Sequence, residues 1–173
     1  MSAKDMVTDI IAQAFVDFIR RVCECENLWK AHAKDLELAK VGDEVTKAIS
    51  EGVEGEYGPV TVKVRKKLLG RREVRVWLYG NEIDVDALLA EISKARSRAA
   101  WLLNDCSENA LLETLYKYED RYLIEVAQRN LDKVKNICAG ELPRIEFGEA
   151  PAHVVEGVVK GVRIYLSGHG TSA

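Results

Sequence analysis

The chain has 173 residues, of which 47% are hydrophobic and 31% are charged, and its formal net charge at pH 7 is −3. This composition is typical of a globular protein and excludes an intrinsically disordered one, and the length is sufficient for one well-packed domain with or without a helical appendage. No apolar run approaches the roughly 20 residues that a membrane-spanning helix needs, and the N-terminus has no signal-peptide pattern. We therefore expect a soluble, cytoplasmic protein.

Residues 1–52 predict an N-terminal helical segment. Apolar side chains recur at helical spacing from Met6 to Val22, with acidic residues on the opposite side. A more polar helix is predicted from Leu28 to Val41, ending at Gly42, and a short helix follows it. The apolar stripe of the first helix has to be buried against the rest of the fold or against a second copy of the chain. The segment is therefore expected to be a docked cap or an oligomerisation arm.

A glycine-rich linker follows this segment. Three glycines and a proline lie between residues 52 and 59, which is a strong signal for a turn or linker. We place the boundary here, between the helical segment (1–52) and an α+β domain (59–173).

Residues 59–80 predict a β-hairpin with one apolar face and one basic face. Apolar side chains alternate with polar or aromatic ones in both strands, and a period of two places them on opposite faces. Gly70 and the two arginines after it supply the turn. The apolar positions are Val60, Val62, Val64, Val74, Val76 and Leu78.

The charge of this hairpin is unusual for the chain. Residues 61–80 contain seven Lys or Arg residues and one acidic residue, Glu73, so their net charge of +6 leaves −9 on the remaining residues. Such segregation predicts an electropositive ribbon that attracts phosphates or an acidic protein surface. The candidate contact residues are Lys63, Arg65, Lys66, Lys67, Arg71, Arg72, Arg75 and Trp77. Tyr79 is expected to share their face, and Lys94, Arg96 and Arg98 to extend the basic surface.

The region after the hairpin predicts two long helices. No Gly or Pro occurs from Asp84 to Ala139, and the one break signal lies at residues 104–107. We expect an αα-hairpin whose second helix ends at Gly140. Strands are then expected at residues 143–147 and 162–166, with a short helix between them that Gly161 ends, and a loose tail from Ser167 onwards. The predicted fold is thus α+β, with a small, mainly antiparallel sheet covered by the long αα-hairpin.

Metal and catalytic sites are not indicated. Cys23, Cys25 and His32 lie close in sequence, but cysteines two residues apart on a helix point about 200° apart, and no zinc-like spacing completes the set. The four cysteines are too few and too scattered for a disulfide scaffold, and buried thiols or a disulfide are a better interpretation of them than a metal site. The chain has only two glutamines, which weakly favours a thermophilic source. Intracellular disulfides are permissible in such a source. Glu146, Glu149, His153 and Glu156 cluster in sequence, but without a nucleophile or ligand motif we assign them no catalytic role, and we expect no cofactor.

The functional hypothesis is a non-enzymatic structural or assembly protein that contacts nucleic-acid phosphates through the hairpin, with weak sequence specificity. Alternatively, the chain is a protein–protein interaction or scaffolding module whose ribbon binds an acidic partner or a neighbouring subunit. A third possibility is an enzyme with a site around His153. The basic face can also be simple solvated surface, with Trp77 packed beneath the helices. Self-association through the first helix or the long helix at 105–139 is expected, and no membrane partner.

Overall fold

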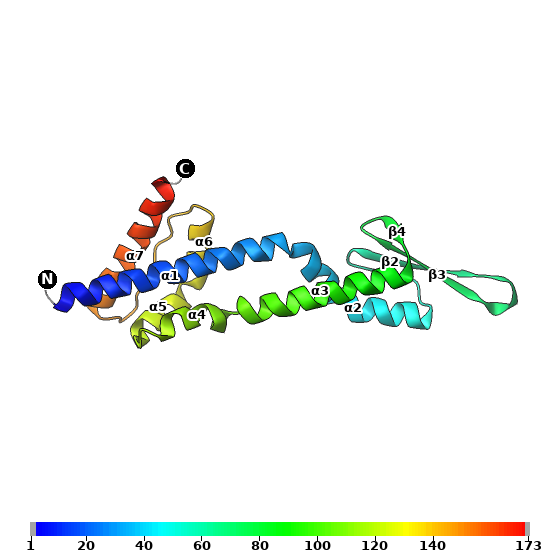
Figure 1. The fold of residues 1–173 in the computed structure, drawn as a ribbon, viewed down its shortest axis with the longest axis horizontal. Helices are drawn as coiled ribbons and strands as arrows, with labels where there is room; N and C mark the ends of the chain where they lie inside the picture. The colour runs from blue at the N-terminus through cyan, green and yellow to red at the C-terminus, as the bar shows by residue number, and fades with distance from the viewer. Residues whose placement is uncertain (1–2, 172–173) are drawn as a thin grey trace. The chain divides into compact units, whose positions relative to one another are not determined.

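The computed structural model describes residues 3–171. In this part of the chain a four-stranded antiparallel sheet is combined with helices, which confirms the predicted α+β class (Figure 1). None of the helices described is long and apolar enough to cross a membrane. The elements in chain order are α1 (Ala3–Ala31), α2 (Ala33–Glu51), β1 (Gly55–Tyr57), β2 (Val60–Lys66), the 3-10 turn η1 (Leu68–Gly70), β3 (Arg72–Leu78), β4 (Asn81–Ile83), α3 (Val85–Asp105), α4 (Glu108–Tyr116), α5 (Arg121–Arg129), α6 (Leu131–Cys138) and α7 (Ala152–Thr171).

The chain forms two compact units. The first comprises Met1–Leu28 and Asn104–Ala173, and the second comprises Trp29–Leu103. The predicted domain boundary at residues 52–59 lies inside the second unit, where it joins α2 to the sheet. The division into a 1–52 segment and a 59–173 domain stays a prediction.

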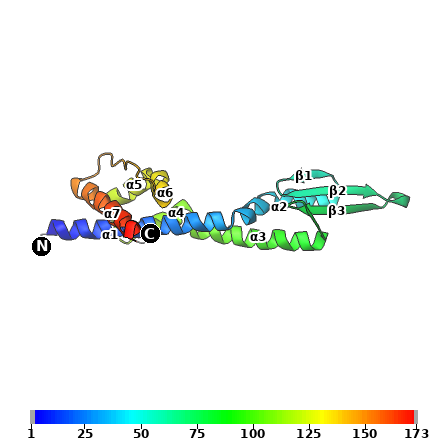
Figure 2. The same ribbon diagram turned by 90° about the horizontal axis from the view of Figure 1, so that it is seen from above.

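The second unit is a sheet covered on one face by α2 and α3. The strand order is β1-β2-β3-β4, and the predicted hairpin pairs Val60 with Leu78 through to Lys66 with Arg72. In Figure 2 the beginning of α3 lies beside the sheet, and the rest of the helix extends past it. The core between sheet and helices consists of Leu38, Val45, Ala48, Val60, Val62, Val76, Leu88, Ile92 and Ala95. The valines that alternate in the hairpin are therefore the residues that hold it to the helices.

Gly42 lies in the middle of α2, so the prediction that it ends a helix is wrong. A Cβ at this position would come within 2.8 Å of the Ile92 Cγ2 atom on α3. The glycine lets the two helices approach closely instead of breaking one of them. Gly52 is the true end of α2: it adopts φ 67°, and the next amide, that of Val53, donates to the Ala48 carbonyl at 2.9 Å.

The first unit packs around α1. The predicted apolar stripe is buried from Ile11 onwards, with Phe15, Phe18, Ile19 and Val22 almost fully covered within this unit. Met6, Val7 and Ile10, at the start of the stripe, are exposed. Most of the stripe is thus buried in cis.

The predicted long helix at 105–139 is wrong, because three helices occupy its place. α4 ends before Glu119, which has φ 51°, and Asp120 starts α5 by accepting a hydrogen bond from the Leu123 amide at 3.0 Å. Asn130 separates α5 from α6. Of the predicted αα-hairpin, the first helix, α3, does cover the sheet, together with α2; the second helix does not.

The two predicted C-terminal strands are also wrong. Residues 141–147 are irregular, and the main-chain amide of Glu146 donates to the Oδ1 atom of the buried Asn130 side chain at 2.7 Å instead of pairing with a strand. The second predicted strand and the beginning of the predicted tail lie in α7. Residues 172–173 of the predicted tail are outside the described residues.

Gly157 and Gly161 explain why α7 continues where a break was expected. A Cβ at Gly161 would lie 2.7 Å from the Ala12 carbonyl oxygen, and one at Gly157 would lie 2.3 Å from the Ile11 Cγ2 atom. Both glycines lie on one side of α7, four residues apart, and both are buried against α1. Their lack of a side chain allows the two helix backbones to pack together.

Two disulfides join α1 to other parts of the first unit. Cys23 is bonded to Cys138 at the end of α6, and Cys25 is bonded to Cys106 between α3 and α4. Because the two α1 cysteines point in nearly opposite directions, each reaches a different partner. The bridges close segments separated by 115 and 81 residues.

We expect Gly161→Ala to destabilise the protein by about 1–3 kcal/mol, because the new methyl group meets the α1 backbone, which cannot rotate away as a side chain can. The matched control is Gly168→Ala in the same helix, where a Cβ meets nothing within 4 Å. The control should be neutral or slightly stabilising. Urea unfolding followed by circular dichroism measures both; equal stabilities of the two variants would contradict the close packing of α1 on α7.

We expect the double variant Cys23→Ser/Cys138→Ser to lose about 2–4 kcal/mol of stability, because a long unfolded loop is no longer constrained. For a chain of this size that loss lowers Tm by roughly 5–15 °C. Differential scanning calorimetry measures it. Thiol titration of the denatured, unreduced wild type should detect no free thiol, and detection of four thiols would contradict both bridges.

Candidate functional site

The face of the sheet opposite the core carries four of the predicted contact residues, namely Lys63, Arg65, Arg75 and Trp77. Lys66 and Arg72 are paired with each other on the valine side, at the end of the hairpin, and Lys67 and Arg71 lie in the turn. Strand register places Thr61 beside Trp77 and Lys63 beside Arg75. Arg65 lies beside Glu73 one step nearer the turn, and Glu82 of β4 lies beside Trp77 on the other side. Because α2 and α3 pack on the valine face, they leave this face of the second unit uncovered; we call it the open face.

The seven cations of the hairpin are all exposed, but they differ in their partners. Lys67 Nζ lies 3.3 Å from a Glu73 carboxylate oxygen. Arg75 donates two hydrogen bonds to Glu82, from Nε at 2.7 Å and from a terminal nitrogen at 2.8 Å. Within the described part of the chain, five cations have no carboxylate oxygen within 4.0 Å: Lys63, Arg65, Lys66, Arg71 and Arg72. We call these five residues the unpaired cations.

Trp77 lies on the open face and is half-buried. The Lys63 ammonium lies 5.3 Å from its ring centroid, and the Arg75 guanidinium carbon lies 5.7 Å from it. These are cation–π distances. The alternative that Trp77 packs beneath the helices is wrong, because its ring helps to position two cations on the opposite side of the sheet.

Arg75 is the most firmly positioned cation. The hydrogen bonds to Glu82, and then the charge of that carboxylate, raise the pKa of Arg75 above its ordinary value. Its charge is therefore permanent, but Glu82 offsets it locally. Arg75 thus shapes the open face more than it adds to its positive charge.

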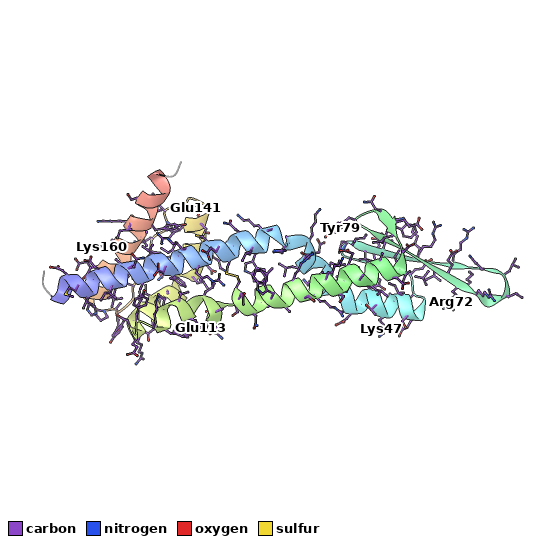
Figure 3. The ribbon with its side chains drawn as sticks, viewed as in Figure 1. Lys47, Arg72, Tyr79, Glu113, Glu141 and Lys160 are labelled. Carbon is purple, nitrogen blue, oxygen red and sulfur yellow. A yellow bond between two sulfur atoms is a disulfide. The ribbon has the colours of Figure 1, made fainter. Side chains whose placement is uncertain are left out.

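Tyr79 does not share this face. It follows the end of β3 with φ 50°, and its hydroxyl donates to the Glu37 carboxylate on α2 at 3.3 Å (Figure 3). Lys34, also on α2, lies over its ring at 5.1 Å. Burial, and then the charge of Glu37, raise the pKa of Tyr79. Tyr79 is thus a link between the sheet and α2.

The expected extension of the basic surface onto α3 is wrong. Lys94 pairs with Glu91 at 3.7 Å, Arg98 pairs with Asp35 at 3.1 Å, and Arg96 pairs with Asp43. All three cations are neutralised locally. The three cations of α3 therefore do not extend the positive charge of the hairpin.

The turn of the hairpin contains two residues that sequence reasoning missed. Leu68 and Leu69 are 93% and 96% exposed, beyond the last strand pair, Lys66 and Arg72. The Lys67 amide closes the turn by donating to the Arg71 carbonyl at 2.7 Å. The sequence does contain a signal for their exposure. The alternation of apolar and polar residues stops at Lys66, so these leucines do not belong to the apolar face of the hairpin.

The residues considered for metal or acid–base chemistry do not converge. Cys23 and Cys25 are disulfide-bonded, and the His32 ring lies 3.2 Å from Asp35. Among the side chains that the structure describes, those of residues 5–168, no group of three or more His, Cys, Asp or Glu could hold a metal ion. Glu146 pairs with Lys133 at 3.3 Å, and no hydrogen bond joins His153 to a carboxylate in the described chain.

A cleft lies in the first unit, between the irregular segment 143–148 and α7. It is an open cleft of about 880 Å³. Its lining combines apolar residues with Arg144, Glu146 and Arg163. This cleft was not predicted from the sequence, because strands were expected at 143–147 and 162–166, in the segments that form its walls.

Comparison of the chain with protein-family models, with curated proteins and with solved structures finds no match.

We expect Glu82→Gln to strengthen the attraction of the ribbon for polyanions, because Arg75 loses the carboxylate that offsets its charge. The variant should elute from a heparin column at higher salt than wild type. Glu56→Gln is a matched control: Glu56 lies on the open face beside Thr61, and the substitution makes the same change in charge without releasing a cation. Identical elution of the two variants would mean that Arg75 takes no part in the surface.

Proposed function

We propose that this protein is a non-enzymatic structural or assembly protein that contacts nucleic-acid phosphates through its basic β-ribbon, residues 60–78. The observation that supports this most directly is the cluster of exposed, unpaired cations on the open face and at the tip of a ribbon whose other face packs on α2 and α3. A nucleoprotein or a small subunit of a nucleic-acid complex needs such an accessible positive surface to contact phosphates. No catalytic residue, cofactor or metal is proposed for the chain.

The mechanism is the neutralisation of phosphates with release of their counterions. If each of the five unpaired cations neutralises one phosphate, a plot of log K against the logarithm of the salt concentration should have a slope of about −4 to −5. Lys67 and Arg75 add to this only where a phosphate displaces Glu73 or Glu82. Phosphate contacts carry no sequence information by themselves, so weak sequence specificity is expected.

Trp77 favours phosphate contact over base stacking. Lys63 and Arg75 both lie at cation–π distance from its ring. A base could stack on this ring only by displacing them. The open face is therefore better suited to a charged backbone than to unpaired bases.

The runner-up is a protein–protein interaction or scaffolding module. The residues outside 61–80 carry a net charge of −9, so a second copy of the chain offers the ribbon an acidic surface. Exposed Met6, Val7 and Ile10 on α1 supply a separate apolar surface for self-association. An acidic partner protein would satisfy the same unpaired cations.

The experiment compares two double variants with equal charge changes. Lys63→Gln/Arg65→Gln removes two unpaired cations from the open face, while Lys40→Gln/Lys47→Gln removes two exposed cations from α2. Fluorescence anisotropy with labelled single-stranded and duplex nucleic acid is measured at several salt concentrations. The ribbon variant should bind roughly 10- to 100-fold more weakly, with a salt slope lower by about 2, and the α2 variant should bind within about threefold of wild type.

Absence of wild-type binding at low salt, or equal losses in both variants, would refute nucleic-acid contact through the ribbon. Binding of polyglutamate by the ribbon under those conditions would favour the acidic-partner alternative.

Multi-angle light scattering of wild type and of Ile10→Asp tests self-association through α1, for which a shift of the variant to lower mass is expected.

A further inference from the structure

The tip of the ribbon is the feature that phosphate neutralisation leaves unexplained. Leu68 and Leu69 are more exposed than any other large apolar side chain described, the next being Leu142 at 76%. Figure 1 shows the ends of β2 and β3 extending beyond α2 and α3 of the same unit. Even a Cβ added at the neighbouring Gly70 would meet nothing within 4 Å. The leucines therefore serve no core of their own unit.

The backbone shows that Leu69 is not there to make the turn. It adopts φ 70°, a left-handed conformation that is unfavourable for leucine and that Gly or Asn adopts readily. Gly70, next to it, has φ 76°. A turn that needs two left-handed residues would be better served by Asn-Gly than by Leu-Gly. The chain tolerates the strain at a position where the side chain projects into solvent.

Cations flank the leucines on both strands. Lys66 and Lys67 precede them and Arg71 and Arg72 follow them, all exposed. Arg72 also lies close to the end of α2, because a Cβ at Gly52 would be 3.4 Å from its side chain (Figure 3). The tip therefore presents two apolar side chains between two pairs of cations. This arrangement is complementary to a ligand that has an apolar interior with a row of negative charges on each side.

On this basis, and resting on the proposed function, we propose that Leu68 and Leu69 enter the minor groove of duplex DNA and wedge between adjacent base pairs while the flanking cations contact the phosphates on either side. Apolar side chains inserted in this way unstack one base step and kink the duplex. Stacked base pairs are the apolar interior, and the two sugar–phosphate backbones are the lines of charge. The wide, shallow minor groove of A-form RNA does not clasp a wedge in the same way.

The distribution of charge favours a duplex over an anionic bilayer. Lys63 lies four residues before Lys67, which is about 13 Å along the strand. A flat lipid surface touched by the leucines would be farther from Lys63 than a Debye length of about 8 Å at physiological salt. A kinked duplex can bend along the ribbon and place phosphates near Lys63 and Arg65. The cations along the ribbon are thus used by DNA and left unused by a membrane.

The test measures kinking separately from binding. A 30-base-pair duplex carries a donor and an acceptor dye at its ends and 2-aminopurine beside a central TA step, which is easily unstacked. Wild type should raise both energy transfer and 2-aminopurine fluorescence. Leu68→Ser/Leu69→Gly removes the wedge and relieves the left-handed strain, so the turn is kept. This variant should retain salt-dependent binding within about tenfold of wild type and lose both signals.

Leu142→Ser is the control, because it removes an exposed leucine from the irregular segment of the other unit. It should behave as wild type does in every measurement. Wild-type binding without either signal, or equal signals from the tip variant, would overturn the wedge and leave phosphate contact through the ribbon intact. Absence of wild-type binding would overturn both. Vesicles of phosphatidylcholine with phosphatidylglycerol form the last arm: tip-dependent vesicle binding without DNA kinking would overturn the wedge in favour of a lipid surface.

Discussion

The burial of one face of the hairpin against α2 and α3 determines most of what the second unit can do. Val60, Val62 and Val76 are almost completely buried there. Because side chains alternate along a strand, their burial obliges Lys63, Arg65 and Arg75 to point away from the helices. A shift of register by one residue would bury these cations and expose the valines. The packing that stabilises the unit thus also creates its charged surface.

In the first unit a different constraint operates, namely the close approach of helices to α1. Gly157 and Gly161 bring α7 against it, and the disulfides of Cys23 and Cys25 bind its two sides to other segments. Each device restricts how far α1 can move within its unit. The uncovered Met6, Val7 and Ile10 then lie on a well-supported helix rather than on a loose arm, as a contact surface requires.

Much of the hairpin could be predicted from the sequence, and the rest of the fold only in part. Strand alternation, the turn at Gly70 and the charge segregation involve residues close in the chain, so local periodicity reveals them. The second break in the helix that was expected at 105–139 lies at Asn130, whose buried side chain makes hydrogen bonds to the backbone of Glu146, sixteen residues away in sequence. Local propensity carries no information about such a partner. The same interaction replaces the strand that was expected at 143–147.

By itself the sequence determined the α+β class, the two faces of the hairpin and the identity of the cations, because each follows from the order of neighbouring residues. The tertiary structure decided which of those cations have partners, since Glu82 reaches Arg75 only through the pairing of β4 with β3. It also decided the meaning of the glycines. The sequence does not distinguish Gly42 and Gly161 from Gly52, which ends a helix. Gly42 and Gly161 instead lie inside helices, at positions where any side chain would collide with a neighbouring helix. Finally, it decided that Leu68 and Leu69 are exposed, because only the ends of α2 and α3 define where the cover of the ribbon stops.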